Sequence, residues 1–276
     1  SGTPSNLLPL EMGECEYEQG TDGCIISHLC DPAVAMIHSP CLPDNWSGLS
    51  VLDTVACASP PFHALIDTGA LITGISNHTV AKELLQRGLS RQFQGVVYFD
   101  SADRKVVLLR DSNRVMPLER CGLPPTARFT FYDQVHTIGT DISQVCTAVA
   151  LLTLGKDMTF RDMAQGAYRL RQLGQGQRVQ LLMAPEVAKL VEAHSKIQIS
   201  ASRNSKFQTA PPPSAKQELV AVLGWLVVNQ MRSEKIQFTM LCEQSLNNVW
   251  RKRAFSLLLN SVAPSPPSQQ QQQQQQ

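Results

Sequence analysis

Arginine and glutamine side chains recur at helical spacing between residues 160 and 173, where they can face a phosphate or a neighbouring lobe. The set is Arg161, Gln165, Arg169 and Gln172, at positions i, i+4, i+8 and i+11. On a helix these positions form one polar stripe. Arg171 falls on roughly the opposite side from Arg169, because two residues rotate a helix by about 200°. Guanidinium groups on such a stripe can stabilise charge during phosphoryl transfer, and the alternative is a solvated face without a ligand.

Asp67 is a second residue that could do chemistry, and it follows apolar residues in the stretch ALIDTGA, residues 64 to 70. This stretch resembles the active-site signature of retropepsin-like aspartic proteases, the retroviral type. Their chemistry needs two carboxylates that share one proton, because two like charges so close together cannot both ionise. The chain holds one copy, so the resemblance implies a homodimer. The alternative is a structural Asp at the junction of a strand and a turn.

Two further stretches, HTIGTDI at residues 136 to 142 and QGAYR at residues 165 to 169, resemble motifs V and VI of superfamily 2 helicases. In that family, motif VI has the pattern Gln-x-x-Gly-Arg-x-Gly-Arg and supplies arginines to the γ-phosphate of ATP bound on the other lobe. The resemblance therefore implies nucleotide or inter-lobe contacts for a set of five residues: Gly139, Thr140, Asp141, Gln165 and Arg169.

The chain departs from the motif VI pattern at two positions. Tyr168 replaces the glycine of the pattern, and Gln172 stands where the second arginine is expected. The chain also lacks a Gly-x-x-x-x-Gly-Lys-[Ser/Thr] loop, so it has no phosphate cradle of its own. The helicase resemblance thus implies a second lobe with no cofactor in this segment, in which ATP and Mg²⁺ belong to a first RecA-like lobe of the parent. The corresponding function is half of an ATP-dependent helicase or translocase motor.

The most extensive resemblance rests on four runs that cover most of residues 62 to 258: ALIDTGALITG, FTFYDQVHTIGTDI, LTLGKDMTFRDMAQGAYRLRQLGQGQ and NQMRSEKIQFTMLCEQSLNNVWRKRAF. They resemble a family of very large fungal, algal and protist proteins with domains of unknown function, labelled ubiquitinyl hydrolase, a thiol-dependent deubiquitinase. The resemblance implies a parent protein that removes ubiquitin from conjugates. Its partners would be ubiquitin or a ubiquitinated protein and the rest of the parent chain.

A thiol hydrolase needs an activated cysteine with a histidine in reach. Cys146 and His136 flank the GTDI segment, and Cys121 and Cys242 are further candidates. None lies in a recognisable family signature, so the catalytic residues stay unassigned, and a buried inert thiol is the alternative for each. The cysteines and histidines between residues 15 and 41 form no CxxC or HxxxH pair, so we predict no metal site.

The elements that would position these residues follow an α/β pattern. Helices are predicted over Thr79–Arg87, with Asn77 as the cap, and from Thr159 to about Leu173, ended by Gly174 and Gly176. Strands are predicted over 62–66, 95–99, 106–109, 129–132, 149–154 and 179–183. Apolar strands that alternate with helices are typical of parallel sheets. We therefore predict a RecA-like α/β lobe, a parallel sheet flanked by helices, over residues 61–199.

The remaining segments have simpler patterns. Residues 1–60 are expected to be irregular, residues 200–215 are a polar and proline-rich linker, and residues 216–260 are a helical segment that reads as two helices. Residues 261–276 form a tail of proline, serine and glutamine, which we expect to be disordered.

Composition excludes some classes of function. The net charge of +1 indicates neither nucleic acid nor an acidic membrane as a partner. Eight cysteines in a chain this long are typical of reduced thiols in an intracellular protein, cytoplasmic or nuclear. The apolar run Leu219–Val228 is too short to span a bilayer, and no signal peptide is visible. The chain begins at Ser1 rather than Met, so we expect it to be a piece of a longer protein.

Overall fold

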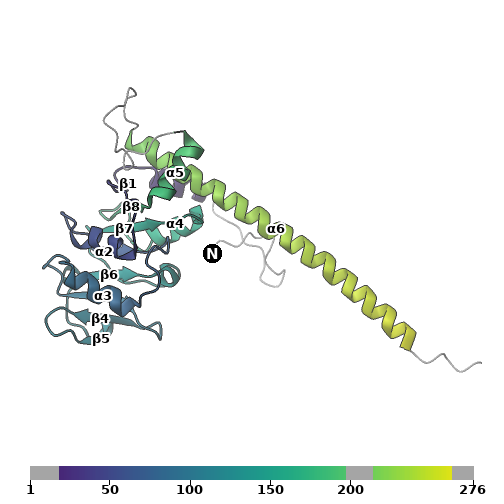
Figure 1. The fold of residues 1–276 in the computed structure, drawn as a ribbon, viewed down its shortest axis with the longest axis horizontal. Coiled ribbons are helices and arrows are strands. Elements are labelled where there is room, and N and C mark those ends of the chain that lie inside the picture. The colour runs from purple at the N-terminus through teal and green to yellow at the C-terminus, as the bar shows by residue number, and fades with distance from the viewer. Residues whose placement is uncertain (1–18, 197–213, 263–276) are drawn as a thin grey trace, which may run out of the picture. The chain divides into compact units, whose positions relative to one another are not determined.

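Eight strands form one mixed sheet in the computed structural model, which describes residues 19–196 and 214–262. The strands are β1 (Ala35–Ile37), β2 (Ala64–Ile66), β3 (Gly95–Phe99), β4 (Lys105–Leu109), β5 (Val115–Pro117), β6 (Arg128–Tyr132), β7 (Val149–Leu154) and β8 (Arg178–Met183). Their order in the sheet is β1-β8-β7-β2-β6-β3-β4-β5, and Figure 1 shows them stacked in one row. The pairs from β1 to β3 in this order are parallel, and β4 and β5 add to β3 in antiparallel fashion.

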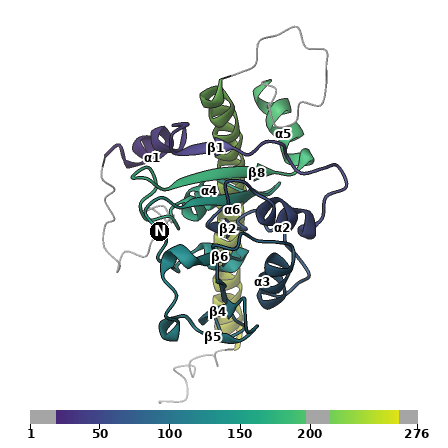
Figure 2. The same ribbon diagram turned by 90° about the vertical axis from the view of Figure 1, so that its left-hand side faces the viewer.

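Helices flank this sheet, which confirms the predicted α/β class and is compatible with a RecA-like fold. They are α1 (Thr21–Leu29), α2 (Gly48–Ala56), α3 (Asn77–Gln86), α4 (Phe160–Ala167), α5 (Pro185–Ser195) and α6 (Ala215–Val262), with 3₁₀ turns η3 (Leu118–Arg120), η4 (Pro125–Ala127) and η5 (Gln134–Thr137). Helices α2 and α3 lie side by side in both views (Figures 1 and 2). Ser76, rather than Asn77, caps α3, because its hydroxyl accepts a hydrogen bond from Thr79 N at 3.2 Å.

The central strand β2 is buried on both faces, which explains its apolar sequence. Its middle residue, Leu65, is in register with Phe131 of β6 and Leu151 of β7, and all three side chains are buried. Parallel strands covered by helices on both faces have continuous apolar runs rather than an alternating pattern. Such apolar runs are visible in the sequence, which is why most of these strands could be predicted from it.

The prediction of an irregular N-terminal segment is wrong for residues 19–60. This part of the chain contains α1, β1 and α2, and β1 extends the sheet by pairing in parallel with β8. Helix α2 buries Val51, Leu52 and Val55 in the core. The predictions for residues 1–18 and for the tail beyond Val262 lie outside the described residues, as does the linker prediction for residues 200–213.

The C-terminal helical segment is one helix, α6, rather than the two that the sequence predicted. The chain divides at Gln230 into two units, and the first sixteen residues of α6 belong to the first unit. There Leu219, Val222 and Leu226 are buried in the core. The second unit starts at Met231 and is described as the remainder of the helix, and all of its residues from 234 to 261 are exposed. None of the described helices is both long enough and apolar enough to cross a membrane.

Two leucines of α6 provide a direct test of this division. We expect Leu226→Ala to lower the free energy of unfolding of the first unit by about 2–5 kcal/mol, because it removes a fully buried side chain and leaves a cavity. Leu241→Ala is the matched control, since Leu241 lies in the second unit and is 42% exposed. Urea titrations followed by circular dichroism measure both. An equal loss in the two variants would contradict the assignment of Leu226 to the core.

Candidate functional site

The strand order has a topological switch point at β2, because later strands are added to the sheet on both sides of it. The strands that follow β2 first build the β6 and β3 side, and then β7 and β8 are added on the other side. In open α/β sheets, ligands bind in the crevice outside the carboxyl ends of the strands at such a switch point. A cavity of about 590 Å³ lies here, lined by Thr68–Ala70, by residues of 134–138 and by Gly155–Met158 with Asp162.

Two glycines hold the loops of this edge in close contact. A Cβ atom added at Gly69 would lie 2.5 Å from Gly155 N, and one added at Gly155 would collide with the carbonyl oxygen of Gly69. Thr153 Oγ1 also accepts a hydrogen bond from Gly69 N at 3.0 Å. The backbone that follows β2 therefore packs directly against the backbone that follows β7, and any side chain at either glycine would force them apart.

The Asp67 carboxylate holds the turn that follows β2. It accepts hydrogen bonds from Leu71 N and Ile72 N, both at 2.9 Å, and from Thr153 Oγ1 at 2.6 Å. Burial raises the pKa of Asp67, although these hydrogen bonds oppose the shift. Asp67 directly follows the parallel strand β2, at the junction of a strand and a turn that the structural alternative describes. Its contacts favour the structural role over the aspartic protease alternative, because both carboxylate oxygens are already occupied inside the fold.

The motif VI segment folds differently from the sequence prediction. Helix α4 ends at Ala167 instead of continuing to Leu173, and the next residues form tight turns in which Arg169 N donates to the Gly166 carbonyl at 3.1 Å. The rotation of about 100° per residue no longer applies beyond Ala167. The helical prediction placed Arg171 on the side opposite Arg169. Because the helix ends at Ala167, Arg171 does not face away from Arg169, and this prediction is wrong.

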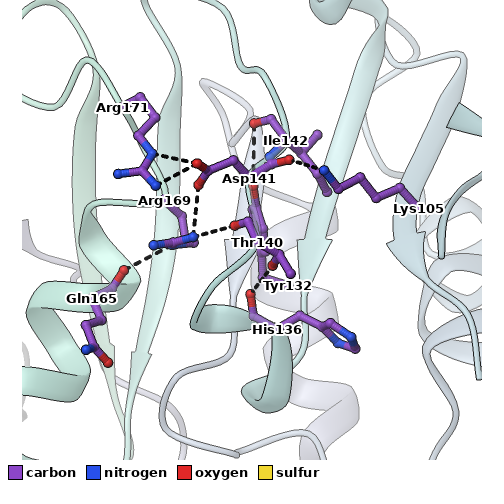
Figure 3. Close-up of polar contacts among 9 residues, drawn as sticks. All are labelled: Lys105, Tyr132, His136, Thr140, Asp141, Ile142, Gln165, Arg169 and Arg171. Carbon is purple, nitrogen blue, oxygen red and sulfur yellow. Dashed lines mark hydrogen bonds and ion pairs between the residues drawn. The ribbon is translucent and has the colours of Figure 1, made fainter. Parts of the chain in front are cut away.

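The two arginines share the carboxylate of Asp141 (Figure 3). Arg169 Nη1 donates to Asp141 Oδ1 at 2.9 Å and to the Thr140 carbonyl, and its Nε donates to the Gln165 carbonyl at 3.2 Å. Arg171 donates to Asp141 Oδ2 from Nε at 2.9 Å and from Nη2 at 2.6 Å. Hydrogen bonds to this carboxylate raise the pKa of Arg171. The side chain of Arg169 is 9% exposed, whereas that of Arg171 is 60% exposed.

The loop that carries Asp141 is itself held at several points (Figure 3). Lys105 Nζ donates to the Asp141 carbonyl at 2.6 Å, and Thr140 Oγ1 donates to the His136 carbonyl at 2.7 Å. The Tyr132 hydroxyl accepts from Ile142 N at 2.9 Å, and burial raises the pKa of Tyr132 to about 12, so this phenol stays protonated. Asp141 therefore presents its carboxylate to the arginines from a fixed loop.

Most of the predicted site residues meet in this cluster. Thr140, Asp141 and Arg169 are joined directly, while Gln165 contributes its backbone carbonyl. Gly139 adopts a φ of 78° and turns the chain just before them. Arg171 and Lys105 were not among the predicted residues. The helical pattern had placed Arg171 on the side opposite Arg169, and Lys105 had no local signal in the sequence.

The thiol candidates are not paired with histidine. His136 Nδ1 lies 2.5 Å from Asp133 Oδ1 and its Nε2 lies 3.1 Å from Asp103 Oδ1, while its ring stacks on Phe99. Within residues 19–196 and 214–262, no hydrogen bond joins a cysteine to a histidine. Cys146 and Cys242 are exposed and Cys121 is half-buried. Over the same ranges, no group of three or more His, Cys, Asp or Glu side chains is arranged to hold a metal ion.

No protein-family model, curated protein or solved structure matches the chain. The family resemblances therefore remain predictions, and the geometry of the carboxyl edge carries the functional inference.

The hydrogen bonds of Asp67 lead to a stability prediction. The asparagine side chain has one oxygen that accepts and one nitrogen that only donates. Asp67→Asn therefore leaves at least one of the three donors, Leu71 N, Ile72 N and Thr153 Oγ1, without an acceptor. We expect a loss of about 1–3 kcal/mol in the free energy of unfolding. Asp157→Asn, at an exposed position on the same cavity wall, should change little. Thermal or urea unfolding measures both, and equal stability of wild type and Asp67→Asn would contradict the structural role.

The stability of the wild type should also depend on pH through Asp67. The unfolded chain titrates near the ordinary Asp pKa of about 3.9, and the folded chain titrates above it. Between these two values the folded state binds a proton that the unfolded state has released, so stability falls as pH rises through the window. The stability advantage of the wild type over Asp67→Asn should shrink across this window. An advantage that grows with pH would show that the folded pKa is lowered.

Proposed function

We propose that this chain is the second RecA-like lobe of a large protein of the ubiquitinyl hydrolase type, and that it presents an arginine to a nucleotide bound by another lobe. The observation that carries this proposal is the cluster of Asp141, Arg169 and Arg171, in which the segment after β6 is joined to the segment after α4. Asp141 and Arg169 are residues for which the helicase resemblance implies inter-lobe contacts.

The charge of the cluster suits an anionic ligand. Two guanidinium groups share one carboxylate, so one positive charge is left uncompensated within the cluster. Guanidinium groups bind phosphate through paired hydrogen bonds and stay charged at any physiological pH. A phosphate group supplied by a partner lobe would complete the charge balance.

The two arginines have different roles in this proposal. Arg171 has most of its side chain in solvent and is bonded to Asp141 alone among the contacts described above, so it can turn toward a phosphate. Arg169 is buried and bonded to two carbonyls and a carboxylate, so it acts as a positioning residue. This reverses the assignment from the motif pattern, in which Arg169 is the phosphate ligand and Arg171 faces away.

The nucleotide itself is assigned to another lobe. The chain has no Gly-x-x-x-x-Gly-Lys-[Ser/Thr] loop. The first turn of α4, which borders the cavity, is closed by a capping box between Thr159 and Asp162. The backbone N–H groups of these two residues are thereby bonded within the chain, and the Asp162 carboxylate would repel a phosphate there.

Ubiquitin removal is proposed for the parent protein, by its family resemblance. This lobe is assigned no nucleophile, because its described cysteines lack a histidine partner and burial raises the pKa of Cys30 and Cys41. A raised pKa lowers the fraction of reactive thiolate. The contribution of this lobe is to couple nucleotide turnover to movement of the parent.

Arginine substitutions in a parent protein that carries both lobes test the proposal. We expect Arg171→Ala to lower ATP turnover by about 10³-fold or more, as loss of an arginine finger does. The melting temperature should change little, because exposed ion pairs contribute about 0–1 kcal/mol. Arg169→Ala should lower both turnover and stability. Arg104→Ala is the control, since Arg104 is also an exposed arginine but pairs with Asp100, at 2.8 Å, instead of with Asp141.

Two outcomes would contradict the proposal. The first is an active parent in which Arg171→Ala and Arg104→Ala turn over ATP equally fast. The second is phosphate release by this chain alone, well above a buffer blank, because a lobe without a phosphate loop should not hydrolyse ATP by itself.

A further inference from the structure

A second cavity lies at the other end of the parallel strands from the one described above. Its volume is about 630 Å³, within the range of about 300–1,000 Å³ that is usual for small-molecule pockets. Phe62 and His63 line it and come directly before β2, whereas Thr68–Ala70 of the first cavity follow that strand. In the same way, Thr147 of the second cavity precedes β7 and Gly155 of the first follows it. The two cavities are therefore separate sites.

One wall of this second cavity is a face of the sheet. Met36 of β1 pairs with Gln180 of β8, and Val149 of β7 pairs with Arg178 of β8. Paired residues of neighbouring strands point to the same face of a sheet, and so do residues two apart along one strand. These four side chains consequently share one face, and all four line the cavity.

A further wall comes from the end of α2 and from the segment that leads from it into β2. Its lining residues are Thr54, Cys57, Ala58, Ser59, Pro60, Pro61, Phe62 and His63. Phe62 is buried, and its ring meets the His38 ring edge-on with the centroids 5.8 Å apart. Together with Met36 and Val149, this wall makes the interior of the cavity largely apolar, as is typical of pockets that hold the hydrophobic body of a ligand.

One guanidinium group supplies the fixed charge of this lining, which lies entirely within residues 36–180. The group belongs to Arg178, and none of the lining residues is Asp or Glu. Among the residues that the structure describes, no carboxylate pairs with the exposed Arg178 side chain. An arginine stays charged at any physiological pH. The cavity therefore combines apolar walls with one uncompensated positive charge.

Two neutral side chains of the lining can donate further hydrogen bonds to an anion. His63 Nδ1 accepts from Val149 N at 3.3 Å, so the hydrogen of the neutral ring is on Nε2. Burial lowers the pKa of His63, which keeps this ring neutral at neutral pH. Gln180 Oε1 accepts from His38 Nδ1 at 2.9 Å, which leaves the amide nitrogen of Gln180 to donate elsewhere.

We propose that this cavity binds an organic carboxylic acid with an aromatic or branched apolar body. Its carboxylate takes paired hydrogen bonds from the Arg178 guanidinium group, and its body lies against Phe62 and the neighbouring prolines. A phosphate monoester carries about two negative charges at neutral pH, and the second would stay uncompensated beside apolar side chains. The charge of the lining thus favours a carboxylate over a phosphate. This assignment does not depend on the nucleotide contact proposed above.

Calorimetric titration of the full chain with naphthylacetate, and with its neutral analogue naphthylacetamide, tests the charge requirement. We expect the acid to bind about 10-fold more tightly than the amide, because hydrogen bonds between charged groups are stronger than neutral ones. Arg178→Gln should remove this preference. Arg114→Gln is the control and should keep it, since Arg114 is also exposed but lies between β4 and β5, outside the lining.

Three results of this titration would overturn the proposal. The first is a wild type that does not bind the acid, and the second is a wild type that binds acid and amide equally. The third is a preference for the acid that Arg178→Gln leaves unchanged.

Protection of Cys57 from alkylation locates the bound acid and needs no substitution. Cys57 is exposed and lines the cavity, whereas Cys242 is an exposed thiol of α6 outside the lining. Saturating naphthylacetate should slow the reaction of Cys57 with iodoacetamide several-fold and leave that of Cys242 unchanged, as measured by mass spectrometry of the labelled peptides. An unchanged rate at Cys57, or equal slowing at both thiols, would show that the acid does not occupy this cavity and would overturn the proposal.

Discussion

One carboxylate shared by two guanidinium groups joins two parts of this fold that lie far apart in the sequence. Asp141 lies in the segment between β6 and β7, and Arg169 and Arg171 follow α4, so their ion pairs join two parts of the chain. Arg169 is buried, and a buried charge that loses its partner costs about 3–5 kcal/mol. The position of Arg171 in turn depends on Asp141, because no other contact described above holds its guanidinium group.

The sheet determines where this cluster lies. Strand β2 sits between β6 and β7, so the segments that follow these three strands meet at one edge. Asp67 fixes the turn after β2, and the contact between Gly69 and Gly155 draws the β2 and β7 loops together. The cavity and the arginine cluster both adjoin the segment that begins at Gln134 and ends at Ile142. The cavity and the cluster are thus connected by one segment, and in the proposed function the uncompensated positive charge of the cluster would contact a phosphate.

The sequence predicted the fold class and most strands of the first unit, because buried parallel strands have apolar runs that are visible without tertiary information. It missed β1, which has three residues and is defined by its pairing with β8. It also extended α4 too far. Arg169 to Leu173 have acceptable helix propensities, and the turn there is fixed by bonds to Thr140 and Asp141, about thirty residues away in the chain. The missed turn explains why Arg171 was placed on the wrong side.

A double-mutant cycle between Asp141 and Arg169 tests most directly whether this carboxylate organises the edge. The free energies of unfolding of Asp141→Ala, Arg169→Ala and the double variant are compared with that of the wild type. If the pair is a structural link, the two losses should be non-additive by about 1–3 kcal/mol, because either substitution alone breaks the same contact. Losses that add to within about 0.5 kcal/mol would show that the two side chains act independently, and would remove the basis for treating Arg169 as the residue that positions the cluster.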